Sequence, residues 1–359
     1  FQYNPQRTGC YSLPQVGKIT PSSGSSKVNT AVAFTTTYSD PNGWQDIQYV
    51  HLLINTAING ANCFYGYYNQ NTNKLYIRND ANNAWLGGYA PSSANTIENS
   101  YVKLNCASTT VSGSGNTLAV KWNIVFKSNF IGTKNSYLYV KDDSGAYSGW
   151  VQKGTWAIDN TPPTTPIVTN DANWTSSTSE LYTTWSSSDP QSGISEYQYR
   201  ITRDSTGGTV IRNWTSTGTY NYVTAGGLSL QNGKTYYFGV KAKNGVGLWS
   251  AASYSQGIVV DTVPLTISGL AIAKSGTEYI ITFGLNRQAK VTGEVSTLVG
   301  YLVRRFASGV QGYAGTNTLK WDGKDSLGRT PAAGPYLLKI TATAPSGKTV
   351  SAMKSFLYP

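Results

Sequence analysis

The feature of this sequence that most constrains its fold is the alternation of apolar and polar residues in short segments. In each such segment every second side chain can face a core while its neighbours face water. Clear cases are residues 135–143, 195–203, 234–244 and 278–285. Asn-Gly, Ser-Gly and Asp-Gly pairs, which favour tight turns, lie between the segments. Because many short strands with frequent turns are typical of antiparallel sandwiches, the sequence predicts an all-β protein.

Two proline-containing segments divide the chain. They are DNTPPTTP, residues 159–166, and DTVPLT, residues 261–266, and each follows a strand-like run. Proline fixes φ and donates no ladder hydrogen bond, so such segments end one sheet and lead into the next. We therefore expect three tandem antiparallel β-sandwich domains behind an extended N-terminal segment. The predicted bounds are 1–25 for the segment and 26–158, 159–261 and 262–359 for the domains.

The composition favours a secreted or cell-surface β-protein. Charged residues make up 13% of the chain, which has 26 Tyr and 10 Trp but one Met and one His. No apolar run approaches the roughly 20 residues of a membrane-spanning helix. The chain begins with Phe and shows no export signal, so we expect a mature chain from which such a signal has been removed.

The net charge of +11 is carried by Lys and Arg that are scattered singly through the strands, with Arg304-Arg305 as the only adjacent pair. Since a nucleic-acid site needs basic residues gathered on one surface, we expect no nucleic-acid partner. Glycans or anionic envelope polymers are the candidate partners that such a surface leaves open.

We expect no enzyme and no catalytic residue. The single His, His51, lies in an apolar strand where a packed side chain is expected, and no G-x-S-x-G elbow accompanies it. The chain has no P-loop, no dinucleotide-binding fingerprint after a strand and no H-E-x-x-H motif. A glycosidase needs only two carboxylates, but most of the 17 acids stand beside turn-forming residues.

One turn in the first domain could hold a cation. The segment SDPNGWQD carries Asp40, Asn42 and Asp46, whose oxygens are the hard ligands that Ca²⁺ prefers. The alternative is a turn stabilised by its own Asp and Asn side chains. We expect no cofactor other than this candidate Ca²⁺.

The middle part, residues 159–261, resembles a fibronectin type III or related immunoglobulin-like module. The resemblance rests on LYTTWSSSDPQSGISEYQYRIT, with Trp185, Tyr197 and Tyr199, and on the late hairpin LQNGKTYYFGVKAKNGVGLWS, with Tyr236. It implies a sandwich fold and assigns no function.

The last part, residues 262–359, resembles the immunoglobulin-like domain of the flagellar hook-capping protein. The resemblance is carried by ITFGLNRQAKVTGEV, VGYLVRRFASG and LKWDGKDSLGRTPAAGPYLLKI. In that family the Trp-Asp-Gly element ends a strand and turns the chain. We therefore expect Trp321, Asp322, Gly323 and Gly334 to be structural, with Asp322 binding turn amides and the glycines taking positive φ.

With the resemblance of its last part to a domain of secreted bacterial proteins, we expect a non-enzymatic structural protein of the bacterial cell surface. The N-terminal segment could add a strand to a neighbouring subunit and build a homopolymeric filament, or fimbrium, or it could cap its own sandwich. Its assembly residues are Phe1, Tyr3, Cys10, Tyr11, Leu13 and Val16. Alternatively, an aromatic and Asn-rich surface could make the protein an adhesin that binds carbohydrate. The candidate binding residues are Tyr65, Tyr67, Tyr68, Tyr76, Trp85 and Tyr89.

The three cysteines leave pairing open. Cys63 and Cys106 lie on strand-like segments of one predicted domain, so we expect a disulfide between them in an oxidising compartment. Cys10 is then free or joined to another chain. Three unpaired thiols are the alternative.

Overall fold

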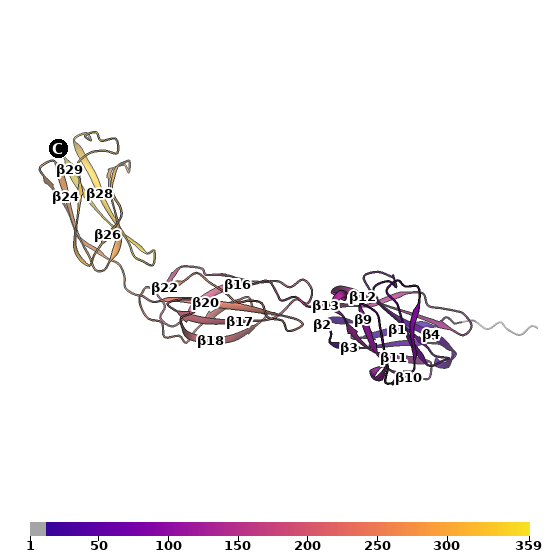
Figure 1. The fold of residues 1–359 in the computed structure, drawn as a ribbon. Coiled ribbons are helices and arrows are strands. Elements are labelled where there is room, and N and C mark those ends of the chain that lie inside the picture. Colours follow the sequence, from indigo (N-terminus) through magenta and orange to yellow (C-terminus); the bar gives the residue numbers. More distant parts are fainter. Residues whose placement is uncertain (1–11) are drawn as a thin grey trace, which may run out of the picture. The chain divides into compact units, whose positions relative to one another are not determined.

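The computed structural model describes residues 12–359 and confirms the all-β prediction. Six sheets account for its strands, and strand pairing stays within three stretches, 15–159, 167–260 and 267–358 (Figure 1). By packing, the chain divides into two compact units, the first of which holds residues up to 166 with 187–197 and 241–251. No helix in the described part is long and apolar enough to cross a membrane.

The first stretch forms a six-stranded and a seven-stranded sheet. The six-stranded sheet has the order β1 (Gln15–Thr20), β3 (Ala31–Ser39), β11 (Thr117–Phe126), β9 (Val102–Asn105) and β8 (Thr96–Glu98), with β10 (Thr110–Ser114) also on β11. The seven-stranded sheet has the order β2 (Ser23–Lys27), β13 (Val151–Asp159), β12 (Gly132–Asp142), β4 (Ile47–Asn55), β5 (Phe64–Asn69), β6 (Lys74–Arg78) and β7 (Trp85–Tyr89). Short 3-10 turns lie at η1 (Trp44–Asp46), η2 (Cys106–Ser108) and η3 (Ser128–Phe130).

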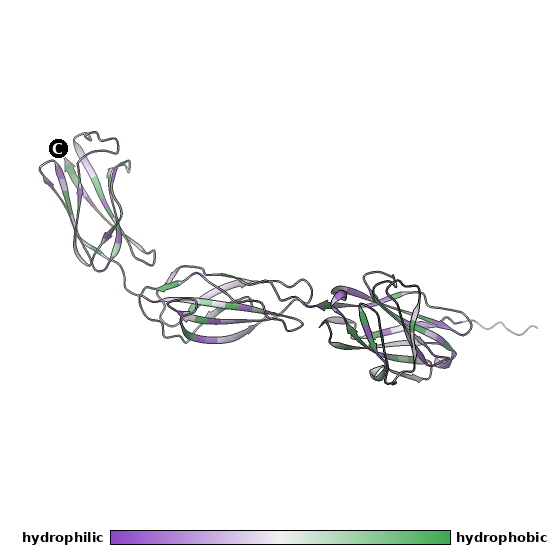
Figure 2. Ribbon diagram, viewed as in Figure 1, coloured by the Kyte–Doolittle hydropathy of each residue, from purple (hydrophilic) through white to green (hydrophobic). Residues whose placement is uncertain are grey.

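The core of this first sandwich is aromatic and aliphatic. Phe34 packs edge-on against Trp156, and Phe64 packs edge-on against Trp122. These rings belong to one cluster of buried side chains drawn from both sheets. Figure 2 shows the strands banded in apolar and polar residues, as expected when one side of each strand faces a core.

The middle stretch forms two further sheets. The smaller one is ordered β14 (Ile167–Thr169), β16 (Leu181–Ser186) and β19 (Tyr222–Ala225). The larger one is ordered β15 (Trp174–Thr175), β22 (Ile258–Val260), β20 (Thr235–Asn244), β17 (Ile194–Arg203) and β18 (Thr209–Gly218), with β21 (Ser253–Tyr254) on β20.

The last stretch pairs a three-stranded with a four-stranded sheet. The three-stranded sheet has the order β23 (Ile267–Ser275), β24 (Glu278–Leu285) and β27 (Gly315–Trp321). The four-stranded sheet has the order β26 (Leu302–Gly312), β25 (Ala289–Thr297), β28 (Gly334–Thr343) and β29 (Thr349–Tyr358). Trp321 is buried in the core between these sheets. Asp261, directly before this stretch, forms an ion pair with Arg287.

Candidate functional site

One side of the seven-stranded sheet is covered with aromatic rings. Along β5 the alternation turns Phe64 and Tyr68 into the core and leaves Tyr65 and Tyr67 half-buried on the opposite side. Neighbouring strands extend the layer, because their rings contact these two. We call this surface the aromatic face; it consists of Tyr49, His51, Tyr65, Tyr67, Tyr76, Trp85, Tyr139 and Trp150.

His51 lies at the centre of the aromatic face. It is opposite Tyr67 on one neighbouring strand and opposite Tyr139 on the other. Its ring stacks on that of Trp150, with centroids 5.7 Å apart. Only 7% of His51 is exposed, so the rings around it exclude water from the imidazole.

The electrostatics of the aromatic face follow from this burial. The pKa of His51 is lowered from 6.5 to about 3. Loss of hydration is the largest cause and the charge of Arg78 adds to it, while a hydrogen bond with the Gly66 backbone opposes both. His51 is therefore neutral at physiological pH. The guanidinium of Arg78 lies 4.1 Å from the ring centroid of Trp85, close enough for a cation–π contact.

Amide side chains border the rings. Asn69 donates a hydrogen bond of 2.7 Å to the hydroxyl of Tyr67. Asn135 donates one to the hydroxyl of Tyr137 and accepts one from Gln152. Ring faces with fixed hydroxyl and amide groups beside them are the combination that binds a ligand with apolar faces and polar edges.

The structure brings together four of the six predicted binding residues, namely Tyr65, Tyr67, Tyr76 and Trp85. Tyr68 is misassigned, because it is 3% exposed and faces the core, where its hydroxyl bonds to Asn73. Tyr89 is exposed at the end of β7. Sequence reasoning missed Tyr49, His51, Tyr139 and Trp150. Alternation toward the end of residues 135–143 was an available signal for Tyr139. Residues 47–55 are largely apolar and are buried on both sides, and Trp150 precedes β13, so no alternation marked the other three.

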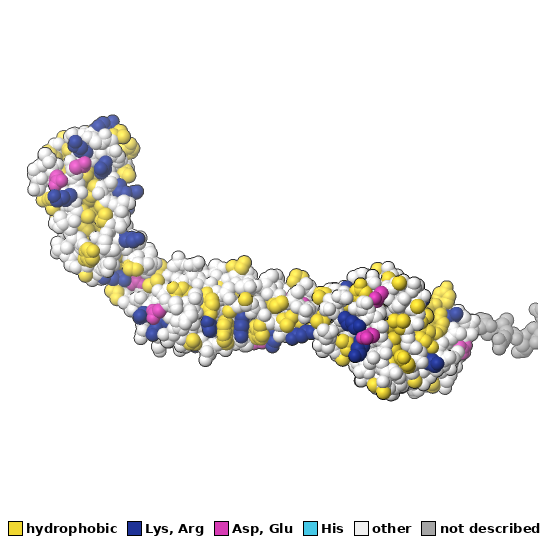
Figure 3. Space-filling model, viewed as in Figure 1, with side chains coloured by type: hydrophobic (Ala, Val, Ile, Leu, Met, Phe, Trp, Pro, Cys, Tyr) yellow, Lys and Arg dark blue, Asp and Glu magenta, His cyan; other side chains and the backbone are white. Residues whose placement is uncertain are grey.

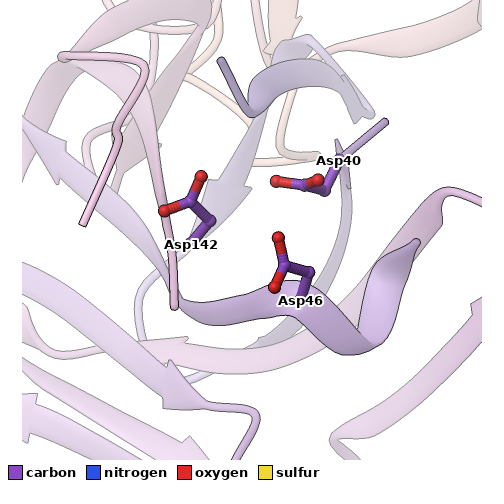
Figure 4. Close-up of side chains that lie close together, drawn as sticks. All are labelled: Asp40, Asp46 and Asp142. Atoms are coloured by element: carbon purple, nitrogen blue, oxygen red, sulfur yellow. The ribbon is translucent and has the colours of Figure 1, made fainter. Parts of the chain in front are cut away.

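A second cluster consists of three carboxylates at one end of the first sandwich. Asp40 ends the β3 segment, Asp46 lies in η1 and Asp142 ends β12. One oxygen of each lies within 4.8 Å of one oxygen of the others, and Figure 4 shows the side chains converging from three segments. Asn42, predicted as a ligand together with Asp40 and Asp46, instead donates its side-chain amide to Asp46, and Asp142 is a member that the sequence did not predict.

Asp40 is the most buried acid of this cluster. It has no exposed surface, its Oδ1 accepts the backbone N–H of Asn42, and its Oδ2 has no hydrogen-bond partner. Burial raises the pKa of Asp40, the N–H of Asn42 opposes this, and the charges of Asp46 and Asp142 add to the rise.

The predicted disulfide is wrong. Cys63 and Cys106 are both buried and free. Cys63 lies directly before β5 of the seven-stranded sheet, whereas Cys106 lies in η2, which follows β9 of the six-stranded sheet. The Cys63 thiol instead donates to the carbonyl of Asn59, and burial raises the pKa of this thiol to about 12.

The N-terminal segment is in part a component of its own sandwich. β1 pairs with β3, and β2 pairs with β13, so residues 15–27 are already bonded within this chain. Val16 lies in β1, while Leu13 is 57% exposed just before it. The other predicted assembly residues, Phe1, Tyr3, Cys10 and Tyr11, lie outside the described residues.

The predicted turn residues of the last stretch contact backbone groups. Trp321 is 1% exposed and donates its indole N–H to the carbonyl of Lys324. Asp322 accepts the N–H of Lys324, and Gly323 and Gly334 have positive φ angles of 75° and 151°. Trp321 and Asp322 thus make hydrogen bonds within this turn, whereas Gly334 lies at the start of β28.

Charged side chains do not gather into one patch in the view of Figure 3, where Lys and Arg are dispersed over the surface. Some of these charges form ion pairs with single acids, such as Lys127 with Glu98 and Arg305 with Glu294.

Comparisons with known proteins find likeness in structure alone; no protein-family model and no curated protein matches the sequence. The chain is similar to dimeric latent PorU from Porphyromonas gingivalis at 12% identity and a TM-score of 0.24, covering 96% of this chain and 34% of that one. It is also similar to a tetra-tandem repeat in the extending region of a large adhesion protein, at 12% identity and a TM-score of 0.29. That match covers 94% of this chain and 99% of the other. A third similar structure is the BSP domain of a biofilm associated protein, at 11% identity and a TM-score of 0.28. That match covers 98% of this chain and 67% of the other.

At these identities and TM-scores the likeness carries no argument about function. The resemblance of the last stretch to the hook-capping domain stays a prediction.

Proposed function

We propose that this protein is a non-catalytic adhesin of the bacterial surface that binds carbohydrate through the aromatic face of its first sandwich. The observation that carries the proposal is the grouping of eight rings, drawn from β4, β5, β6, β7, β12 and the segment before β13, on one side of one sheet. Antiparallel sheets commonly have polar residues on the side away from the core, so a layer of eight rings there departs from the usual pattern.

The chemistry of the rings favours a sugar. Tyr67 and Trp85 are half-buried, and the Arg78 guanidinium lies over the ring of Trp85. We expect the parts of these rings that stay exposed to accept the C–H groups of a pyranose ring, and the nearby Asn69 amide to bind its hydroxyls. Stacking of the rings on one another holds them in place before a ligand arrives, so little conformational entropy is lost on binding.

The test is glycan-array binding of the full chain with two variants. Trp85→Ala removes a ring of the aromatic face, and we expect a loss of signal of at least tenfold. The matched control is Tyr220→Ala, which removes a 65% exposed ring of the middle stretch. Absence of glycan binding by the unmodified protein, or equal binding by Trp85→Ala, contradicts the proposal.

Assembly into a homopolymeric filament is the second candidate, favoured by the position of β1 at the edge of its sheet. An edge strand has unpaired backbone groups that another chain can bond. Removal of residues 1–25 would delete β1 and half of β2, so the informative truncation removes residues 1–13 only. Electron microscopy of the full chain is expected to show polymers that this truncation abolishes. Single particles for the full chain, or polymers that persist after truncation, would refute it.

A further inference from the structure

The hairpin turns after β12 and β20 fold in the same way. Asp142 and Asn244 are the corresponding residues: the backbone N–H of Asp142 bonds to the carbonyl of Ala146, and that of Asn244 bonds to the carbonyl of Leu248. Their side chains make equivalent hydrogen bonds. Oδ1 of Asp142 accepts the backbone N–H of Ala146 at 2.8 Å, and Oδ1 of Asn244 accepts that of Leu248 at 2.7 Å.

A Ser-Asp-Pro turn lies beside each of these hairpins. In the first sandwich Oδ1 of Asp40 accepts the N–H of Asn42, and in the middle stretch Oδ1 of Asp189 accepts the N–H of Gln191. Asp40 and Asp142 therefore correspond to Asp189 and Asn244.

In the middle stretch, the amide of Asn244 bridges two acids. Its Nδ2 donates to Oδ2 of Asp159 at 2.9 Å and to Oδ2 of Asp189 at 3.1 Å. The hydroxyl of Ser192 donates to Asp159 as well. Each buried carboxylate thus has a donor, as a buried charge requires.

The first sandwich lacks this donor, because a carboxylate stands where the amide would be. Asp142 is 2% exposed and Asp46 supplies a third carboxylate nearby. Asp40 is fully buried, and its Oδ2 accepts no hydrogen bond. The corresponding atom in the middle stretch, Oδ2 of Asp189, accepts one from the amide of Asn244. We infer that a divalent cation, Ca²⁺, takes the place of the missing amide and bridges Asp40, Asp46 and Asp142.

The spacing of the oxygens suits this ion. Ca²⁺ binds oxygen at about 2.3–2.6 Å, so two ligand atoms on opposite sides of it stand roughly 4.6–5.2 Å apart. The three carboxylate oxygens lie within 4.8 Å of one another. Ca²⁺ accepts carboxylates from different segments in a flexible geometry, whereas Mg²⁺ demands a near-ideal octahedron, so we expect Ca²⁺ to bind the more tightly.

Isothermal titration of the full chain with CaCl₂, after treatment with a chelator, tests the inference. We expect one Ca²⁺ per chain and weaker binding of Mg²⁺. The decisive variant is Asp142→Asn, which restores the amide found at Asn244. Its Oδ1 can still accept the N–H of Ala146, so the hairpin is expected to fold. We expect at least tenfold weaker Ca²⁺ binding, together with a melting temperature in chelator equal to or above that of the parent protein.

The matched control is Asp171→Asn, which makes the same charge change at an exposed acid and is expected to bind Ca²⁺ like the parent protein. Circular dichroism checks the fold of each variant. Should Asp142→Asn misfold, Asp46→Asn decides in its place, since Asp46 lies in a surface turn. Failure of the parent protein to bind Ca²⁺, or undiminished binding by a folded variant of the cluster, overturns the inference.

Discussion

The imidazole of His51 lies nearly parallel to the indole of Trp85, with an interplanar angle of 7° and ring centroids 5.8 Å apart. Trp150 stacks on the same imidazole at an angle of 28°. The two contacts keep a titratable group out of water, and stability should therefore depend on pH.

We expect acidification to destabilise the first sandwich through His51. Its folded pKa, about 3, is below its unfolded value of 6.5, so the stabilisation is complete above pH 6.5 and is lost as pH falls from there toward 3. Between pH 7 and pH 5 the free energy of unfolding should drop by about 2 kcal/mol from this group. Urea unfolding at the two pH values measures it. His51→Phe is the control, because the chain has no other His, and an equal drop in that variant would contradict the assignment.

Removal of the Asn244 amide should destabilise the protein strongly. Asn244→Ala leaves the buried carboxylates of Asp159 and Asp189 without the donor between them. We expect a loss of about 3 kcal/mol, measured by urea unfolding. Asn213→Ala, at an exposed position, should change stability by less than about 0.5 kcal/mol. Similar values for both variants would show that the bridge has little net effect.

Substitution of Trp321 should lower the free energy of unfolding far more than substitution of Asp322. Trp321 packs on Tyr279 at 5.0 Å between centroids, so Trp321→Ala is expected to lose about 3–5 kcal/mol through the cavity it leaves. Asp322→Ala removes one turn hydrogen bond at an exposed site and should lose about 1 kcal/mol. Thermal unfolding followed by circular dichroism measures both losses. An equal loss for the two variants would contradict the view that Trp321 is a core residue and Asp322 makes only one turn hydrogen bond.

Neither described cysteine should react in the native state. Burial keeps the Cys63 thiol protonated, with a pKa near 12, and also raises the pKa of Cys106. In a Cys10→Ser variant, Ellman's reagent is expected to label no thiol until denaturant is added and two thiols afterwards. A reducing agent should leave the unfolding midpoint unchanged. No labelled thiol in denaturant would point to a disulfide after all.

The fold was predictable because it depends on local alternation and turn residues. Alternation in residues 278–285 marks β24 with bounds identical to those in the structure. The same rule, applied to Phe64 through Tyr68, would have separated the core-facing Tyr68 from Tyr65 and Tyr67. The error arose because the aromatic residues were grouped by composition.

The sites were less predictable because they depend on register between distant strands. His51 stands beside Tyr139 only through the pairing of β4 with β12, which no local pattern specifies. Asp142 likewise joins Asp40 from about a hundred residues away. A local signal for Asp142 did exist in the similarity of its hairpin, YVKDDSGAYSGW, to VKAKNGVGLWS around Asn244.

The parallel pairing of β2 with β13 determines how the first sandwich carries mechanical load. The strand near its beginning and the strand at its end run side by side, from Ser23 opposite Thr155 to Lys27 opposite Asp159. Tension between the two ends of the sandwich pulls these strands past each other, so their hydrogen bonds are strained in shear and resist together instead of opening one after another. The middle stretch repeats the device where β15 pairs in parallel with β22. Such resistance would suit the adhesin that we propose, because an adhesin must hold its cell against flowing liquid.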